Sequence, residues 1–298
     1  MGQIRVGTCS WTDPTLIASR RFYPEWAKSA EDRLRFYAGQ FPVVEVDSSY
    51  YAMPSEDTAR LWVERTPDDF IFDVKAFRLF THHPTPLKAF PKDVQQALPP
   101  QAQTASLYQR DVPNDLVDEL WRRFESTLLP LDSTCKLGVV LLQFPHWFYP
   151  GDSQRKYIAD CKTKLPQYRL AVEFRHGSWL SEKNRDRTLA FLRENDVPLV
   201  CVDGPQGFRS SMPRIAEATS DTGIIRFHGR NADTWEKKGL KVQERFNYLY
   251  SESELREWVP GIRALAGRTR QLHVLFNNNY EDQAVTNGRQ MQTLLDQE

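Results

Sequence analysis

The chain has 298 residues, 40% of them hydrophobic, which is enough to bury the core of one barrel or of two smaller domains. Its 39 basic and 39 acidic side chains balance to a formal net charge of zero, which argues against a protein that coats nucleic acid or an anionic membrane through general positive charge. No window of the sequence is long and apolar enough to span a bilayer, so we expect no membrane segment.

Eight short runs rich in Val, Ile, Leu and Phe have the pattern of β-strands that are buried on both faces. In chain order, we predict strands at 3–9, 42–47, 70–75, 137–143, 169–174, 198–203, 223–228 and 271–276. Helical patterns predict helices at 30–40, 55–65, 114–128, 153–164, 181–195, 252–266 and 281–296. Several helix starts carry a cap residue with an acid close behind it, as in Ser55-Glu56-Asp57.

The alternation of strands and helices predicts an α/β protein with a (β/α)8 TIM-barrel fold, formed as a single domain over residues 1–298. Two segments interrupt the pattern. Residues 81–113 contain six prolines and a Gln-rich stretch, so we expect a long loop that forms an irregular insertion after the third strand. In residues 204–222, Gly, Pro and Ser replace the expected sixth helix, which predicts a degenerate unit there.

Polar residues follow most of the predicted strands, and the carboxyl ends of the strands form the active-site face of a TIM barrel. Alternate residues of a strand point to the same side, so polar residues two apart share a face. Four such pairs are Glu45 with Asp47, Asp73 with Lys75, Glu173 with Arg175, and Arg226 with His228. Because an unpaired buried charge is very costly, these groups must pair with one another, face water, or hold a ligand or metal.

The residue types suggest roles for the strand-end groups. Glu173, with Asp203 or Glu45, has the chemistry of a general acid and base, and His228 that of a proton donor or ligand. Cations can hold a phosphate or carboxylate, which gives this role to Lys75, Arg175 and Arg226. Further candidates for substrate contacts are Gln143, His176, Trp11, Tyr50, Asn277 and Asn278. The alternative is a self-neutralised network of these charges with no ligand.

The sequence indicates no cofactor. His176 and His228 are ligand types for a divalent metal, but no H-x-H or H-E-x-x-H spacing supports such a site. The basic residues between 226 and 245 are most simply a solvated face, with phosphate binding as the minority interpretation.

The four cysteines are scattered without a C-x-x-C pair, and the amino end carries no secretory signal, so we expect a reduced, cytoplasmic protein. Cys9 has no fixed basic partner in sequence, which favours a buried inert thiol over a nucleophile.

Taken together, the segments IRVGTCSW, VVEVDSSYYAMPS, FDVKAFRLFTH, LGVVLLQFP, LAVEFRHGSW, VCVD, IIRFHGR, YLYSESEL and LHVLFNNNYEDQAVTNG resemble the DUF72 family, also called YecE-like proteins. The resemblance runs in order over nearly the whole chain. It implies a single TIM barrel similar to those of endonuclease IV and xylose isomerase, in a family without an established activity. The chain lacks a recognisable full set of metal ligands like that of endonuclease IV, so the resemblance does not imply a trinuclear zinc site.

Three functions remain open from the sequence. The first is an enzyme that acts on a small or terminal anionic substrate, such as a phosphorylated sugar, nucleotide or nucleic-acid end, by acid–base or hydrolytic chemistry at the barrel mouth. The second is a non-catalytic protein that binds a nucleotide or nucleic acid in the same pocket. The third is a structural or partner-binding protein whose polar barrel interior only neutralises itself.

Overall fold

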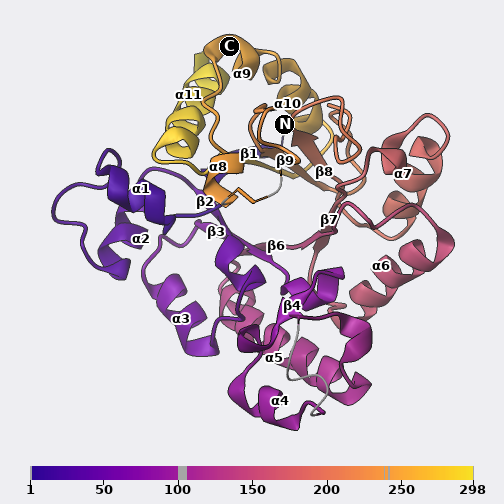
Figure 1. Cartoon of the computed structure of the whole chain (residues 1–298). Coiled ribbons are helices and arrows are strands. Elements are labelled where there is room, and N and C mark those ends of the chain that lie inside the picture. The colour runs from indigo at the N-terminus through magenta and orange to yellow at the C-terminus, as the bar shows by residue number, and fades with distance from the viewer. Residues whose placement is uncertain (1, 100–105, 238, 241, 298) are drawn as a thin grey trace.

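The computed structural model describes residues 2–99, 106–237, 239–240 and 242–297. Eight parallel strands form the centre of the molecule, and helices surround them (Figure 1). The barrel strands are β1 (Gln3–Thr8), β2 (Val43–Val46), β3 (Ile71–Lys75), β6 (Leu137–Gln143), β7 (Leu170–Glu173), β8 (Val200–Asp203), β9 (Thr222–Phe227) and β10 (Gln271–Phe276). All eight lie at predicted positions, and the TIM-barrel prediction is confirmed.

The strands follow the order β7-β6-β3-β2-β1-β10-β9-β8 in one hydrogen-bonded sheet. The two edge strands meet where Val172 forms an isolated parallel bridge with Leu199, and the Val172 amide donates to the Pro198 carbonyl at 2.9 Å. This contact nearly closes the barrel. A closed parallel barrel directs the carboxyl ends of all its strands to one mouth, which is where polar side chains from distant parts of the sequence can meet.

Helices cover the outside of the barrel (Figure 1). They include α1 (Pro14–Ser19), α2 (Ala30–Ala38), α3 (Glu56–Glu64), α5 (Asn114–Ser133), α6 (Asp152–Lys164), α7 (Arg185–Glu194), α9 (Glu252–Arg256), α10 (Val259–Ala266) and α11 (Gln283–Gln297). Two short helices, α4 (Lys92–Ala97) and α8 (Val242–Arg245), belong to the long connections after β3 and β9. Among the described residues, none of these helices has the length and apolar character that crossing a membrane requires.

The predicted helix at 252–266 is wrong as a single element, because the structure divides it into α9 and α10. Pro260 lies in the first turn of α10, where a missing amide donor and a fixed backbone angle are tolerated, whereas the middle of a helix would not accept it. The start of α9 is as the sequence suggests, since Ser251 and Glu254 form a reciprocal capping box.

The insertion at 81–113 is more ordered than the predicted loop. Its described part contains α4 and a two-stranded antiparallel sheet of β4 (Thr85–Pro86) and β5 (Ser106–Leu107). Phe77, Phe80 and Phe90 bury aromatic rings beside this insertion, which gives it an apolar anchor that composition alone does not reveal. The segment 204–222 contains no helix before β9 begins, so the degenerate unit after β8 is confirmed.

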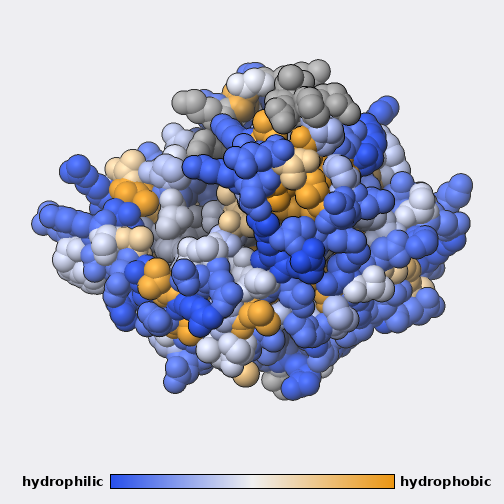
Figure 2. Space-filling view, turned by 90° about the horizontal axis from the view of Figure 1, so that it is seen from below, coloured by the Kyte–Doolittle hydropathy of each residue, from blue (hydrophilic) through white to orange (hydrophobic). Residues whose placement is uncertain are grey.

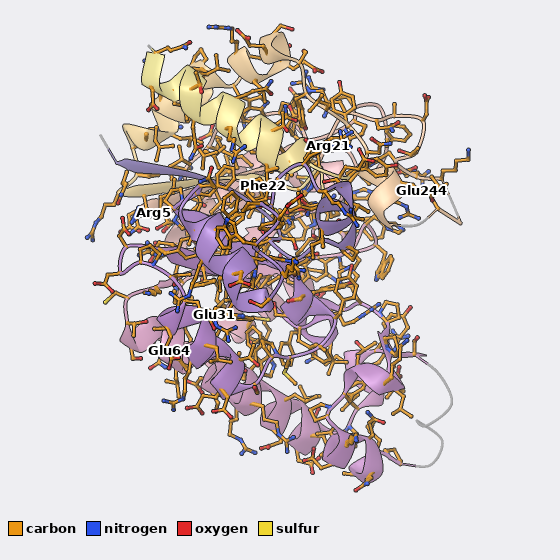
Figure 3. The ribbon with its side chains drawn as sticks, turned by 90° about the vertical axis from the view of Figure 1, so that its left-hand side faces the viewer. Arg5, Arg21, Phe22, Glu31, Glu64 and Glu244 are labelled. Atoms are coloured by element: carbon orange, nitrogen blue, oxygen red, sulfur yellow. The ribbon has the colours of Figure 1, made fainter. Side chains whose placement is uncertain are left out.

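Two clusters of buried apolar side chains pack between the barrel wall and its helices. Figure 2 shows a face that is mostly hydrophilic, with one larger apolar area near its upper edge. Figure 3 shows the barrel from the side, with Arg5 of β1 at one end and Glu244 of α8 at the other. The short helix α8 therefore lies at the mouth of the barrel, where the strands end.

Candidate functional site

A cluster of buried charges fills the upper part of the barrel. We call Glu45, Glu173, Arg175, Arg226 and His228 the central cluster. Arg226 lies between two carboxylates, donating from Nη2 to Glu45 Oε1 at 2.6 Å and from Nη1 to Glu173 Oε2. Arg175 forms an ion pair with the other oxygen of Glu173. Three strands, β2, β7 and β9, with the residues that directly follow β7 and β9, thus place opposite charges together, as the same-face pattern predicted.

His228 has a defined place in this cluster. Its Nε2 lies 3.1 Å from Glu173 Oε1, and its Nδ1 lies 2.8 Å from Asn277 Nδ2. An amide nitrogen donates, so Nδ1 accepts and Nε2 carries the proton that is directed at Glu173. Burial, together with the charge of Arg175, lowers the pKa of His228 to about 3, which agrees with a neutral imidazole.

The two carboxylates of the cluster differ in charge state. Burial raises the pKa of Glu45 to about 7 despite the opposing charge of Arg226. Glu45 Oε2 is also buried without a hydrogen-bond partner among the described residues. Burial acts in the same direction on Glu173, but the charges of Arg175 and Arg226 outweigh it and hold its pKa well below the ordinary value. At neutral pH, Glu45 is therefore the carboxyl group that can gain or lose a proton.

A second buried ion pair adjoins the cluster. Lys75 Nζ donates to Asp47 Oδ1 at 2.6 Å and lies 4.7 Å from the ring centre of Tyr50. Burial opposes the charge of Lys75, but the nearby carboxylate of Asp47 outweighs it and raises the lysine pKa. Lys75 is thus neutralised by Asp47, with Tyr50 beside it.

A cavity of about 740 Å³, which we call the mouth cavity, opens above these charges. It is lined by His83, Gln143, Pro145, His146, Trp147, Tyr149, Arg175, His176, Arg209, Ser210, Trp235, Glu236, Arg245 and Phe246. This volume falls within the range of small-molecule sites, and the lining combines aromatic rings with a few convergent polar groups, as such sites do.

The lining of the mouth cavity is predominantly cationic. Three arginines line the cavity, Arg175, Arg209 and Arg245, together with one carboxylate, that of Glu236. Burial, with the charge of Lys75, lowers the pKa of His83 to about 3, so this imidazole is neutral and can donate or accept a hydrogen bond. Arg245 Nε is buried without a hydrogen-bond partner among the described residues. These groups suit an anionic ligand better than a cationic one.

Gln143 and Arg175 connect the mouth cavity to the central cluster. Both line the cavity, and Gln143 Oε1 lies 3.4 Å from Arg175 Nη2 and 3.4 Å from Arg226 Nη1. Arg175 also lies under the indole of Trp235, with 5.6 Å from its guanidinium carbon to the ring centre. The floor of the cavity is therefore formed by a guanidinium whose other side is paired with Glu173.

Most predicted site residues come together here, but three do not. Asp203 and Asn278 belong to networks outside the barrel interior, and Trp11 packs edge-on against Trp62 in the hydrophobic core. Asn278 Nδ2 donates to Asn287 Oδ1 and the Tyr248 carbonyl. The remaining candidates lie in the central cluster, beside it or in the mouth cavity: Glu45, Tyr50, Lys75, Gln143, Glu173, Arg175, His176, Arg226, His228 and Asn277.

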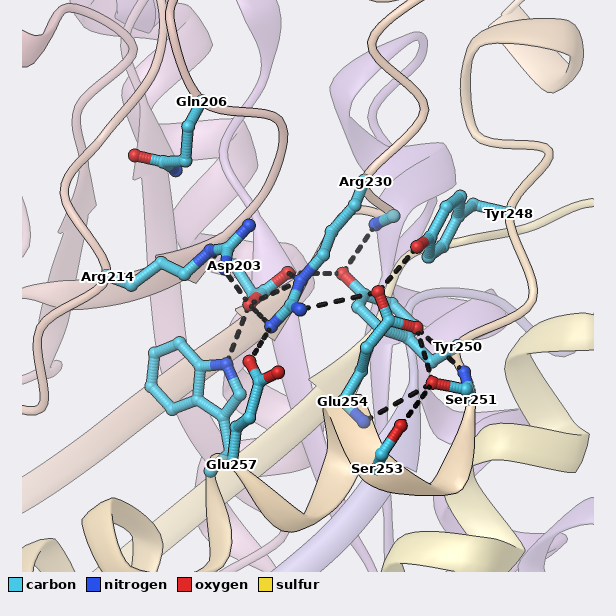
Figure 4. A network of polar contacts seen from close by, with 12 residues as sticks. Asp203, Gln206, Arg214, Arg230, Tyr248, Tyr250, Ser251, Ser253, Glu254 and Glu257 are labelled. Atoms are coloured by element: carbon cyan, nitrogen blue, oxygen red, sulfur yellow. Dashed lines mark hydrogen bonds and ion pairs between the residues drawn. The ribbon is translucent and has the colours of Figure 1, made fainter.

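Asp203 serves as an anchor for the segment after β9 (Figure 4). It pairs with Phe227 in the sheet register, so its side chain takes the outer face of the strand and not the barrel interior. Its oxygens accept from Tyr250 at 2.8 Å, Trp258 at 2.7 Å and Arg230 at 2.8 Å. These contacts saturate the carboxylate, and the structure thereby separates Asp203 from Glu173.

Replacing Asp203 with Asn is expected to lower the free energy of unfolding by about 2 kcal/mol, because the buried donors of Trp258 and Arg230 lose a charged acceptor. Urea denaturation measures this difference. The matched control is Asp118→Asn, since Asp118 pairs only at the surface with Lys164 and its loss should cost under about 0.5 kcal/mol. Equal effects of the two variants would contradict the anchoring role.

The basic residues between 226 and 245 do not form one solvated face. Arg226 and His228 are buried in the central cluster, Arg230 pairs with Asp203, and Arg245 lines the mouth cavity. Lys238 and Lys241 lie outside the described residues. Nearness in the sequence does not predict a common face here, because Arg226 and His228 point into the barrel from β9 and its end, while the segment that follows carries Arg230 and Arg245 to other places.

Cys9 is fully buried, as expected, and burial together with Glu45 raises the pKa of its thiol well above the ordinary value. Such a thiol is mostly protonated and therefore a poor nucleophile. Among the residues that the structure describes, no three His, Cys, Asp or Glu side chains come together in a way that could hold a metal ion.

The sequence did not indicate several residues of the mouth cavity. These are His83, His146, Trp147, Tyr149, Arg209, Trp235, Glu236 and Phe246. They come from the long connections after β3, β6, β8 and β9. The length of these connections was the one sequence feature that pointed to them, because long loops at the carboxyl ends of barrel strands commonly build binding sites.

Comparisons with known proteins agree with this architecture. A protein named UPF0759 protein YunF from Bacillus subtilis is 33% identical over 298 residues, covering 98% of this chain and 95% of its own. The UPF0759 protein YecE of Escherichia coli K12 is 25% identical, covering 74% of this chain and 75% of its own.

Solved structures show the same fold. A DUF72 family protein from Thermotoga maritima aligns with a TM-score of 0.76 and 30% identity over 99% of each chain. A second, from Enterococcus faecalis, has a TM-score of 0.80 and 24% identity over 99% of this chain and 96% of its own. Residues 5–298 match the family described as "Protein of unknown function DUF72". The chain therefore belongs to the DUF72 family.

Proposed function

We propose that the protein is an enzyme that binds a small or terminal anionic substrate in the mouth cavity and acts on it by acid–base or hydrolytic chemistry. The substrate class is a phosphorylated sugar, a nucleotide or a nucleic-acid end. The observation that carries the proposal is the convergence of three arginines on one cavity directly above a cluster that contains a carboxyl group titrating near neutrality.

Anion binding falls to Arg175, Arg209 and Arg245. A guanidinium can donate two parallel hydrogen bonds to a phosphate, and it does so more strongly than a neutral donor. The aromatic lining, including Trp147 and Trp235, offers flat faces for a sugar ring or a base beside the bound charge.

Proton transfer falls to Glu45 because its pKa of about 7 lets it serve as acid or base at neutral pH. Glu173 stays ionised and orients Arg226 and His228. Glu45 is fully buried, so substrate reaches it only when the floor of the cavity opens. A ligand anion that competes with Glu173 for Arg175 would draw that side chain upward and provide the opening.

The alternative function is non-catalytic binding of a nucleotide or nucleic acid in the same cavity. A specific observation favours it: the side chains of Glu45, Glu173, Arg226 and His228 have no exposed surface. Arg226 pairs with both carboxyl groups, and the neutral His228 hydrogen-bonds to Glu173. The two functions share the ligand site and differ in whether a product appears.

Binding and turnover of phosphorylated sugars, nucleotides and short nucleic-acid ends test both functions. We expect saturable binding that weakens about tenfold in Arg175→Ala and in Arg209→Ala, as each removes one charge-assisted contact. Arg209→Ala guards against misfolding, because Arg209 is exposed and lies outside the buried cluster. The control is Arg60→Ala, which removes a surface arginine of α3 that pairs with Glu56.

The outcomes separate the alternatives. Binding with a product that disappears in Glu45→Gln supports the enzyme. Binding without a product from any of these compounds supports the non-catalytic protein. Absence of binding, or equal binding by the wild type and Arg209→Ala, contradicts an anion site in the mouth cavity.

A further inference from the structure

A second cavity, of about 590 Å³, is built largely by the insertion after β3. We call it the side cavity. Its lining consists of His82, Tyr108, Gln109, Arg110, Asn114, Trp147 and Tyr157. None of these residues belongs to the central cluster, and the insertion has no part in closing the barrel, so the side cavity is not explained by the fold alone.

The side cavity adjoins the mouth cavity. Trp147 lines both of them, and its indole is 40% exposed despite its size. The consecutive residues His82 and His83 line the side cavity and the mouth cavity, respectively. A ligand seated in one cavity can therefore continue past Trp147 into the other.

The chemistry of the two cavities differs. Among the described residues, the side cavity has one lining cation and no lining carboxylate, whereas three arginines line the mouth cavity. The cation, Arg110, stacks over Tyr108 at 4.8 Å from the ring centre. The side-chain amides of Gln109 and Asn114 add hydrogen-bonding groups, of which Gln109 Oε1 is already in contact with the Tyr157 hydroxyl. This lining suits an uncharged, planar, hydrogen-bonding ring.

One further polar atom has no partner in the side cavity wall. His82 Nε2 is buried without a hydrogen-bond partner among the described residues, while the ring of His82 contacts Tyr157 edge-on at 4.2 Å. The Tyr157 hydroxyl, by contrast, contacts two acceptors, the Phe80 carbonyl at 2.7 Å and Gln109 Oε1, and its single proton serves one of them. Because His82 Nε2 is buried, a ligand ring in the side cavity would reach it only after the His82 ring turns toward the cavity.

We propose that the substrate is a linear molecule with two planar rings joined through a phosphate, the chemistry of a dinucleotide or longer single strand. Its phosphate-bearing unit occupies the mouth cavity, and the neighbouring base occupies the side cavity against Trp147. This inference rests on the proposed function of the mouth cavity and specifies its substrate. Base stacking on an aromatic side chain gives affinity without sequence preference. A neutral oligosaccharide fits less well, because it lacks the charge that the arginines require.

Equilibrium titrations with three defined probes test the inference. Adenosine 5′-monophosphate fills the mouth cavity alone, and the 5′-phosphorylated adenosine dinucleotide reaches both cavities. Adenosine 5′-diphosphate adds charge without a second ring. We expect the dinucleotide to bind at least about tenfold more tightly than either probe with a single base, as one additional stacked base provides.

Two variants and a control locate this gain. Tyr108→Ala and Arg110→Ala should remove most of the dinucleotide advantage, and Arg110 is safe to replace because its side chain is 80% exposed. Trp26→Ala is the matched control, since Trp26 is a 60% exposed aromatic residue that packs on Phe36 away from both cavities. It should leave the affinities for all three probes unchanged.

The titrations distinguish a failure of the dinucleotide substrate from a failure of the anion site. If the probes with a single base bind through Arg209 and the dinucleotide binds no more tightly, the proposal of a substrate with two bases is wrong and the anion site stands. An advantage that persists in both side-cavity variants also overturns the inference. If no probe binds, both proposals fail.

Discussion

Replacing Arg226 with methionine is expected to lower the free energy of unfolding by about 3–5 kcal/mol. Arg226 is fully buried and pairs with both Glu45 and Glu173. Methionine fills much of the space but leaves Glu173 with less compensation for its buried charge and returns Glu45 to an apolar surrounding. Urea denaturation of the wild type and the variant measures the difference.

Two further variants sharpen this test. Arg60→Met makes the same substitution at a surface arginine that is 60% exposed, and it should cost under about 0.5 kcal/mol. Adding Glu45→Gln to Arg226→Met should recover part of the loss, because it removes the carboxyl group that has lost its partner, while Glu173 keeps its ion pair with Arg175. A loss below about 1 kcal/mol for Arg226→Met would show that the cluster is hydrated and not buried as described.

The stability of the wild type relative to Glu45→Gln is expected to fall by about 3 kcal/mol as the pH rises from 4.5 to 8. The pKa of Glu45 is raised from 4.5 to about 7 in the folded protein, so the folded state binds a proton that the unfolded chain has already lost. The contribution of Glu45 is thus complete below pH 4.5 and is lost as the pH passes through 7. Denaturation of both proteins across this range measures it.

The comparison with Glu45→Gln is needed because other groups act in the opposite direction. The lowered pKa values of Glu173 and His228 favour the folded state at higher pH, and both groups are present in both proteins. Glu56→Gln, on the surface of α3, serves as the control and should show no such trend. A difference that stays flat or grows with pH would mean that Glu45 is a permanently ionised partner of Arg226.

The fold was predictable from the sequence because strands buried on both faces leave continuous apolar runs. All eight barrel strands could be placed in this way. Helix boundaries were less certain where local chemistry decides them, as at Pro260, which separates α9 from α10. The order within the insertion depends on burial of aromatic residues such as Phe80 and Phe90 against distant partners, which no local pattern reveals.

The central cluster was predictable in part because alternate residues of a strand point to the same side. Period-two spacing places Glu173 with Arg175 and Arg226 with His228, and the structure brings these four side chains together. The same rule separates Asp203, whose outward direction depends on the register of β8 with β9 and could not be derived from composition. The walls of the mouth cavity come from irregular loops, where Trp235 and Arg209 have no periodicity to place them.

A crystal structure determined with adenosine 5′-monophosphate at saturating concentration would test the anion site most directly. We expect the phosphate in the mouth cavity, within hydrogen-bonding distance of Arg175 and Arg209, with the base against an aromatic side chain of the lining. A mouth cavity that stays empty at saturating nucleotide, or a phosphate bound away from these arginines, would contradict the proposed site.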